Sequence, residues 1–188
     1  MNFAFFKRLI NKDPKFLPNK CFSQNGEDLI LNRLFENKSN GFFVDIGAHH
    51  PVRFSNTYLF YLNGWSGINV DAMPSSMEIF DKIRPRDINI EVGISSQEGK
   101  LTYYKFNEPA LNTFDSLEAE SKNKDPYKII GKVNLFTTTL EQLLKKNLPC
   151  GQVIDFINID VEGKDLDVLT SNDWNIFRPK FILIEILR

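Results

Sequence analysis

Short apolar runs recur along the chain and are separated by segments with helical spacing. We predict that these runs are strands, because apolar stretches of this length are typical of strands that are covered on both faces. They lie at residues 41–46, 67–71, 88–94, 153–159 and 181–187. Strands that alternate with helices form a parallel sheet with helices on both sides. The pattern therefore predicts an α/β fold with a doubly wound, Rossmann-like, mostly parallel sheet.

Capping signals and chain breakers bound the predicted helices. Ser55 is a candidate N-cap for a helix that stops at Asn63-Gly64. A second helix over residues 75–83 must end before the next proline. Thr139 stands three residues before a glutamine and just ahead of an apolar pair, which is capping-box spacing. A third helix is therefore expected to begin at Thr139.

The middle and the end of the chain depart from this alternation. Gly99 lies in a turn between the strand at 88–94 and an apolar stretch at 101–106, which predicts a small antiparallel excursion. Residues 107–132 are polar with mixed charge, and we interpret them as a lid-like insertion. The buried-type strand at 181–187 ends the sequence with an unpaired edge. We therefore expect a domain truncated at its C-terminus, or a homo-oligomer that covers this edge.

The composition is that of one globular domain. The chain has 188 residues, of which 42% are hydrophobic and 25% charged, with a net charge of −1. This balance lacks the surplus of cations that binding to nucleic acid requires. Cys21 and Cys150 lie too far apart to suggest a disulfide framework or a metal site, so a cytoplasmic location is expected.

The first 20 residues form an N-terminal extension to a domain at 21–188. The extension begins with an apolar stretch, but Lys7 and Arg8 interrupt it before it is long enough to span a membrane. We predict a terminal helix that docks on the domain, in preference to contact with a membrane surface.

Small and acidic residues follow the strands where a doubly wound sheet binds its ligands, beyond the carboxyl ends of the strands. Gly47 follows the first strand, and its lack of a Cβ lets the backbone approach a ligand. Asp71 ends the second strand 24 residues later, near the spacing of an acid that binds both ribose hydroxyls. The alternative for Asp71 is an acid that only faces solvent.

The glycine loop does not match a dinucleotide site. It has a single glycine, and Pro51 stands where a pyrophosphate-binding loop would have another. A nucleoside cofactor without phosphate therefore suits the loop better. A nicotinamide-dependent oxidoreductase on the same fold remains an alternative, as does a domain that binds a cofactor without catalysis or serves in assembly.

Several side chains are candidates for proton transfer. Asp160 and Glu162 follow the fourth strand and can orient an acceptor hydroxyl or take its proton. Asp160 can instead cap a helix that begins near Gly163. His49 in the glycine loop is a candidate base, with a positioning role favoured. Glu185 in the last strand either faces the active-site end of the sheet or is a structural anchor. No metal is predicted.

The order of motifs resembles the FkbM-type methyltransferase family from residue 21 to residue 187. The main motifs are SQNGED at 23–28, VDIGA at 44–48 and IDVEG at 159–163. The segments SNTY at 55–58, GW at 64–65, RPRD at 84–87 and ALNTF at 110–114 look like a recurring subtype of that family. The resemblance implies a class I methyltransferase fold and S-adenosylmethionine as the methyl donor. It also implies O-methylation of a small hydroxylated acceptor, such as a sugar.

The resemblance also implies roles for individual residues. Those expected to contact the cofactor are Asp45, Gly47 and His49 at its methionine end, Asp71 at the ribose, Gly93 and Ile94 at the adenine, Asp160 beside the methyl group, and in addition Ala48 and Ala72. Glu27 is expected to reach the acceptor. Asn112 and Thr113, in the lid-like segment, are expected to close over it. Residues 21–188 would then be the methyltransferase domain.

Overall fold

Five parallel strands form the central sheet of the computed structural model, which describes residues 20–35 and 38–185. Across the sheet, these strands are β3 (Ile88–Glu91), β2 (Ser66–Asp71), β1 (Phe42–Ile46), β7 (Phe156–Ile159) and β8 (Phe181–Ile184). The strand order reverses between β1 and β7, as in a doubly wound fold. The predicted α/β class with a mostly parallel sheet is therefore confirmed.

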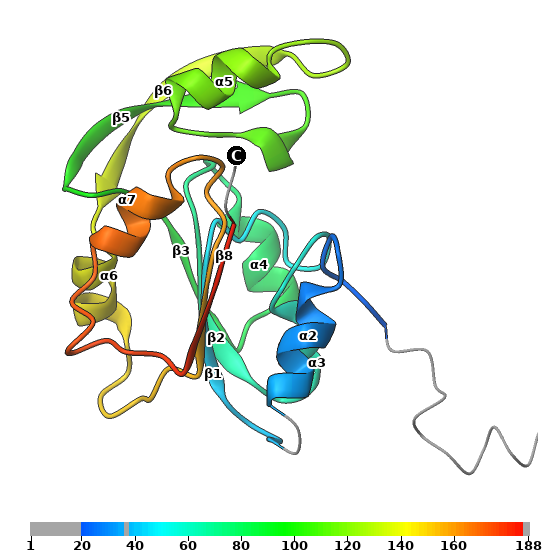
Figure 1. The fold of residues 1–188 in the computed structure, drawn as a ribbon, viewed down its shortest axis with the longest axis vertical. Coiled ribbons are helices and arrows are strands. Elements are labelled where there is room, and N and C mark those ends of the chain that lie inside the picture. Colours follow the sequence, from blue (N-terminus) through cyan, green and yellow to red (C-terminus); the bar gives the residue numbers. More distant parts are fainter. Residues whose placement is uncertain (1–19, 36–37, 186–188) are drawn as a thin grey trace, which may run out of the picture.

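Helices cover both faces of this sheet (Figure 1). On one side lie α2 (Glu27–Leu34), α3 (Tyr58–Leu62) and α4 (Met77–Ile83), and on the other lie α6 (Leu140–Asn147) and α7 (Asp165–Thr170). Each helix buries at least one apolar residue on the side that faces the sheet, as expected for helices that cover a sheet.

Alternate side chains of β1 supply two separate cores. Val44 and Ile46 pack in one core with Leu140 and Leu144 of α6. Phe43 points to the opposite face and belongs to the second core. The other members of that core are mostly aromatic: Leu31, Phe35, Phe60, Trp65 and Phe156. Because both faces are buried, β1 lies at the centre of the molecule.

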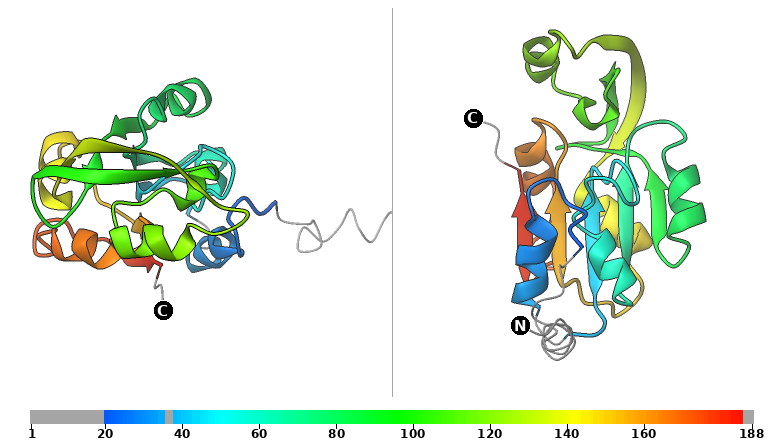
Figure 2. Two further views of the ribbon diagram at one scale, coloured as in Figure 1. Left: turned by 90° about the horizontal axis from the view of Figure 1, so that it is seen from above. Right: turned by 90° about the vertical axis from the view of Figure 1, so that its right-hand side faces the viewer.

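A second, smaller sheet stands beyond the carboxyl ends of the main strands (Figures 1 and 2). Its strands, in the order β4-β6-β5, are β4 (Gly93–Ile94), β6 (Ile129–Thr138) and β5 (Gly99–Phe106). The short 3-10 helix η2 (Pro109–Leu111) and the helix α5 (Ser116–Lys122) connect β5 to β6. This sheet forms a roof over the edge of the main sheet where ligands of doubly wound folds bind.

The predicted strand at 88–94 is wrong, because the structure divides it between the two sheets. The first part is β3, and the Val92 N–H still donates to the Asp71 carbonyl 2.9 Å away. Asp71 ends β2, so no further partner continues that pairing. The chain then joins the small sheet, where β4 pairs with β6. An unbroken alternation of apolar residues does not report which sheet each residue enters.

The antiparallel excursion is confirmed, but its partner differs from the prediction. β5 pairs in antiparallel register with β6 and not with the strand at 88–94. The interval 107–132, interpreted as an insertion, contains η2, α5 and the start of β6. β5 therefore pairs with a strand that follows it only after η2 and α5. Local turn signals do not reveal such a long-range pairing.

Three of the predicted caps can be compared with the structure. Thr139 is the N-cap of α6 as predicted, and its hydroxyl accepts the Gln142 N–H at 3.2 Å. Ser55 is not the N-cap of α3, which is Thr57, although the Ser55 hydroxyl accepts the Tyr58 N–H at 3.0 Å. Asp160 does not cap the following helix, because α7 begins only at Asp165.

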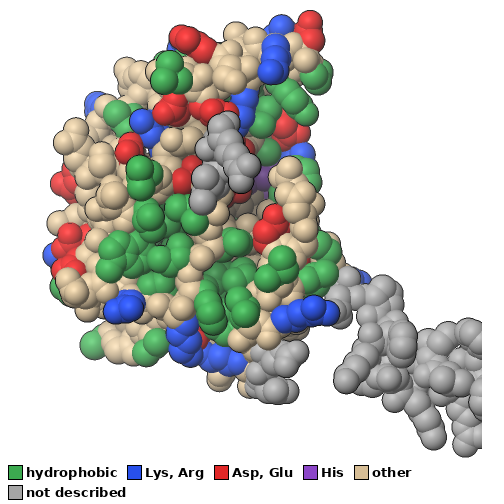
Figure 3. Space-filling view, viewed as in Figure 1, with side chains coloured by type: hydrophobic (Ala, Val, Ile, Leu, Met, Phe, Trp, Pro, Cys, Tyr) green, Lys and Arg blue, Asp and Glu red, His purple; other side chains and the backbone are tan. Residues whose placement is uncertain are grey.

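The predicted strands at 153–159 and 181–187 both differ in extent or burial. β7 begins at Phe156, because Val153 is exposed and Asp155 turns its carboxylate back to accept the Phe42 N–H at 3.0 Å. β8 is an edge strand and not a buried one, with Phe181 37% and Ile182 40% exposed. Hydrophobic side chains gather around β8 on the face in Figure 3.

Some predictions fall on residues outside the described ones. These are the N-terminal helix, within residues 1–19, and the last part of the strand at 181–187. Coverage of the β8 edge by a second copy stays a prediction. Among the described helices, none has the length and apolar character that crossing a bilayer requires.

The aromatic core gives a test of the fold. Phe156 is fully buried and has ring contacts with Phe35, Phe43, Phe60 and Trp65. Phe156→Ala is expected to lower the free energy of unfolding by about 3–5 kcal/mol, because it leaves a cavity. Phe136→Ala, at a position 68% exposed, is the control and should change it by less than about 0.5 kcal/mol. Urea denaturation measures both, and equal losses would contradict the assignment of this core.

Candidate functional site

A cavity of about 280 Å³ lies between the carboxyl ends of the main strands and the small sheet. Every residue singled out as a site residue from the sequence lines it: Glu27, Asp45, Gly47, Ala48, His49, Asp71, Ala72, Gly93, Ile94, Asn112, Thr113, Asp160 and Glu162. The structure therefore brings the whole set together, while the role of each residue remains a prediction. In the space-filling view, acidic side chains lie along this hollow (Figure 3).

Gly47 makes the tight turn that opens the cavity. Its φ is +82°, and its N–H and that of Ala48 both donate to the Val70 carbonyl, at 2.9 and 3.0 Å. A Cβ on Gly47 would lie 1.7 Å from the Asp160 carbonyl oxygen. The glycine is therefore required by the close approach of two backbone segments, as well as by its φ.

Asp71 at the end of β2 ties this turn in place. One carboxylate oxygen accepts the His49 N–H at 2.9 Å and the other accepts the Met73 N–H at 2.7 Å. Burial raises the pKa of Asp71, and these two hydrogen bonds oppose the rise. Each carboxylate oxygen can accept a further hydrogen bond. Asp71 thus offers two fixed acceptors to a ligand in the cavity.

His49 is held in a neutral form. Its Nε2 lies 3.1 Å from Nη1 of Arg53, whose guanidinium also makes two hydrogen bonds to Glu108, at 3.0 and 2.9 Å. Arginine only donates, so Nε2 must be the acceptor. Burial, and then the charge of Arg53, lowers the pKa of His49 to about 4. These contacts favour a positioning role for His49 over a role as base.

Three carboxylates gather at the mouth of the cavity. Asp160, Glu162 and Glu185 each bring an oxygen within 4.8 Å of the others. Glu185 directly follows β8 and lines the cavity, so its side chain faces the active-site end of the sheet, one of the two alternatives weighed from the sequence. Such a group can hold a cationic ligand or a divalent metal ion, and the expectation of no metal stays a prediction.

Asp160 and Glu162 differ in their electrostatic surroundings. Burial, together with the charges of Glu185 and Glu162, raises the pKa of Asp160 to about 8. Burial raises the pKa of Glu162 as well, but Glu162 forms an ion pair with Lys122. Of these two neighbours, Asp160 is therefore the better candidate for taking up a proton near neutral pH.

The lid residues are fastened to the site by their own hydrogen bonds. The Thr113 hydroxyl donates to the Glu162 carbonyl at 2.6 Å, and the Asn112 amide donates to the Met73 sulfur at 3.6 Å. With the Lys122–Glu162 ion pair, these contacts hold the small sheet over the mouth of the cavity. Glu27 reaches the cavity from α2, where its carboxylate accepts the Asn25 N–H at 2.9 Å.

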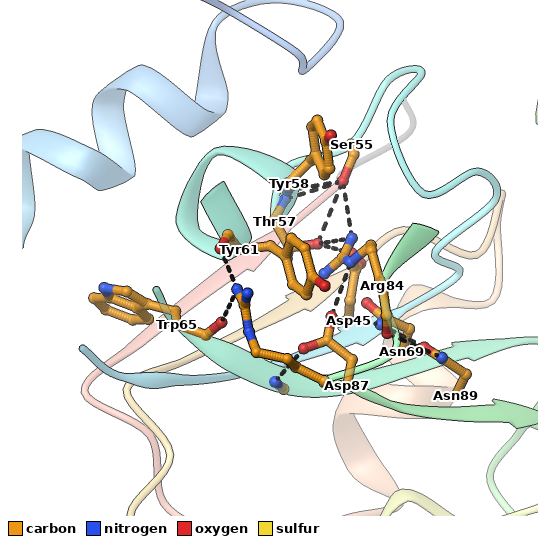
Figure 4. A network of polar contacts seen from close by, with 12 residues as sticks. Asp45, Ser55, Thr57, Tyr58, Tyr61, Trp65, Asn69, Arg84, Asp87 and Asn89 are labelled. Atoms are coloured by element: carbon orange, nitrogen blue, oxygen red, sulfur yellow. Dashed lines mark hydrogen bonds and ion pairs between the residues drawn. The ribbon is translucent and has the colours of Figure 1, made fainter. Parts of the chain in front are cut away.

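A buried polar network lies behind one wall of the cavity (Figure 4). Asp45 of β1 accepts hydrogen bonds from the Thr57 hydroxyl at 2.6 Å and from the Asn158 amide at 2.8 Å. Arg84 donates to the Thr57 hydroxyl at 3.0 Å and forms an ion pair with Asp87 at 2.8 Å. None of these partners of Asp45 was predicted as a site residue.

Other lining residues were also missed. Tyr103 and Phe114 form part of the roof, with ring centroids 4.8 Å apart, and Asn56 and Asn158 form part of the wall. Asn158 carried a signal, a polar residue within an apolar strand, as did the segments 55–58 and 84–87 of the family resemblance. Tyr103 carried none, because an aromatic residue in a strand is usually part of a core.

The comparisons with known proteins bear on this geometry. No characterised protein and no solved structure matches the chain. The model of the methyltransferase FkbM domain matches residues 45–188, which include the end of β1, the Gly47 turn, Asp71 and the Asp160 loop. This match extends over more than half of the sequence. The chain therefore belongs to the FkbM methyltransferase domain family.

Proposed function

We propose that the protein is an S-adenosylmethionine-dependent O-methyltransferase whose acceptor is a small, uncharged hydroxylated molecule such as a sugar. One observation carries the proposal: Asp71, the Gly47 turn and Asp160 line the same cavity at the point where the strand order reverses. An acid at the end of the second strand suits a ribose, and a carboxylate beyond the fourth strand suits a reacting hydroxyl.

The lining residues fit a nucleoside without phosphate. Asp71 offers acceptors for ribose hydroxyls, and Val92 and Ile94 supply apolar surface for a base. Among the described residues that line the cavity, no lysine or arginine is present to bind a pyrophosphate. This supports S-adenosylmethionine over a nicotinamide dinucleotide, the alternative raised from the sequence. Exposed thiols at Cys21 and Cys150 are consistent with the cytoplasmic location that we also propose.

When bound, S-adenosylmethionine supplies an electrophilic methyl group on a sulfonium. In this proposal Asp160 takes the proton of the acceptor hydroxyl, since a base is most effective when its pKa lies near the working pH. His49 and Glu162 orient the groups around it, because each is already paired with a cation. Thr113, through Glu162, and Asn112, through Met73, keep the roof closed, which excludes water and holds the acceptor in position.

The charge of the cavity supports an uncharged acceptor. Its described lining includes six carboxylates: Glu27, Asp45, Asp71, Asp160, Glu162 and Glu185. The cations nearest the rim are already paired, Arg53 with Glu108 and Lys122 with Glu162. A phosphate or carboxylate on the acceptor would face uncompensated repulsion. A neutral sugar hydroxyl avoids this cost.

Binding of the cofactor tests the proposal most directly. Asp71→Asn is expected to weaken binding of S-adenosylhomocysteine about tenfold or more, because an amide nitrogen cannot accept a ribose hydroxyl. Glu91→Gln is the matched control, since Glu91 ends the neighbouring strand but does not line the cavity. Isothermal titration calorimetry with S-adenosylmethionine, S-adenosylhomocysteine and NAD measures these affinities. Binding of NAD alone would sink the proposal.

The role of Asp160 predicts a pH dependence. The pKa of Asp160 is raised to about 8, so the carboxylate is mostly protonated at pH 7. The rate of methyl transfer should therefore rise with pH as Asp160 ionises and level off above the pKa. Asp160→Asn should lower kcat about 100-fold and change the affinity for S-adenosylhomocysteine, which lacks the methyl group, much less than Asp71→Asn does. Glu120→Gln, on the exposed side of α5, is the control. A flat pH profile would exclude Asp160 as the base.

Acceptor charge is tested with matched sugars. Transfer of a labelled methyl group from S-adenosylmethionine is measured for neutral methyl glycosides and for their 6-phosphate and uronate counterparts. The neutral member of each pair is expected to have a kcat/KM at least about tenfold higher, because of repulsion by the lining carboxylates. Preference for an anionic member contradicts the assignment of acceptor charge. Cofactor binding without transfer to any acceptor favours a domain that binds without catalysis.

A further inference from the structure

Arg84 and Asp87 form an ion pair whose side chains are both fully buried, with 0% exposure. Such a pair contributes little to stability compared with apolar residues of the same size, because both charges lose their hydration. Arg84 follows α4, Asp87 precedes β3, and neither lines the cavity. What distinguishes the pair is the chain of hydrogen bonds that leads from Arg84 to the cavity wall.

The first part of this chain has only one possible direction. Arg84 donates to the Thr57 hydroxyl, since a guanidinium has no acceptor. The single hydroxyl proton of Thr57 is then directed to the Asp45 carboxylate, 2.6 Å away. The Thr57 hydroxyl therefore links the Arg84 guanidinium to one carboxylate oxygen of Asp45 by two consecutive hydrogen bonds (Figure 4).

The second part orients two amides on the cavity wall. An ionised Asp45 only accepts, so Asn158 must present its NH2 group to it, at 2.8 Å. The Asn158 oxygen is then free to accept the NH2 group of Asn56, at 3.0 Å. This leaves the Asn56 oxygen as a buried acceptor without a partner among the described atoms. Both amides line the cavity.

The orientation of this wall depends on the charge of Asp45. Burial raises the pKa of Asp45, while the Thr57 hydroxyl, Arg84 and Asn158 lower it, and the charge of Asp87 raises it. Asp71 and Asp160 also lie close enough to interact with it. With so many acids around it, Asp45 would readily take up a proton without Thr57 and Arg84. A protonated Asp45 becomes a donor and no longer fixes the Asn158 amide.

We propose that Arg84 and Thr57 are positioning residues that keep Asp45 ionised and thereby orient Asn158 and Asn56 so that the Asn56 oxygen is an acceptor for the ammonium group of the methyl donor. The identity of that ligand rests on the proposed function. The ammonium group of the methyl donor can only donate hydrogen bonds. The Asn56 oxygen, at the cavity wall, is an acceptor without a hydrogen-bond partner among the described atoms. The sequence segments 55–58 and 84–87 thus meet in one hydrogen-bond network, although Thr57 and Arg84 are 27 positions apart along the chain.

The experiment uses two substitutions at Thr57. Thr57→Val keeps the shape and removes the hydroxyl, whereas Thr57→Ser restores it. In the ligand-free protein, the carboxyl carbon of Asp45 is titrated by NMR. Thr57→Val is expected to move its titration to higher pH, and Thr57→Ser to leave it as in the wild type. Arg84→Lys keeps the positive charge but loses the planar guanidinium that donates to both Thr57 and Asp87. It provides a second variant for the same Asp45 titration should Thr57→Val fail to fold, and the same shift to higher pH is expected.

Affinity for S-adenosylhomocysteine, measured by calorimetry from pH 6 to pH 8, is the second readout. Thr57→Val should weaken binding about tenfold at pH 6, and the loss should shrink as the pH rises and favours the ionised form of Asp45. An unchanged Asp45 titration together with an unchanged pH profile of binding overturns the proposal. If the wild type does not bind S-adenosylhomocysteine, the proposed function fails, and the Asp45 titration still decides whether Arg84 and Thr57 control its charge.

Discussion

The contact between the turn after β1 and the loop after β7 is the constraint on which the rest of the site depends. These two strands are neighbours at the point where the strand order reverses, and Gly47 passes so close to the Asp160 carbonyl that no side chain fits between them. The contact sets the distance between the glycine turn and the acids of the β7 loop. The parallel pairing of β1 with β2 brings Asp71 to the same edge of the sheet.

Charge is distributed unevenly around this constraint. The cavity is lined by carboxylates, and the cations beside it are used to fasten segments together: Arg53 joins the glycine loop to Glu108, and Lys122 joins α5 to Glu162. Arg84 lies behind the wall and reaches Asp45 through Thr57. Cations thus hold the structure around the cavity while its described lining stays acidic, which suits a cationic or neutral ligand.

The small sheet completes the site and was the least predictable part of the fold. The alternation of apolar residues at 88–94 indicated one strand, but the chain changes sheets at Val92, where β2 has ended. β5 pairs with β6 across η2 and α5, and this places Tyr103 and Thr113 over the cavity. Local periodicity reports whether a residue is in a strand, but not which strand becomes its partner.

The sequence by itself determined the α/β class, the approximate positions of the parallel strands and the residues that gather at their carboxyl ends, because these follow from periodicity and from motifs that are local in the chain. Only the tertiary structure decided how those residues are used. Burial and neighbouring charges separate Asp160 from Glu162, and Arg53 takes up the lone pair of His49. Such effects depend on distances between segments far apart in sequence, and spacing along the chain does not contain them.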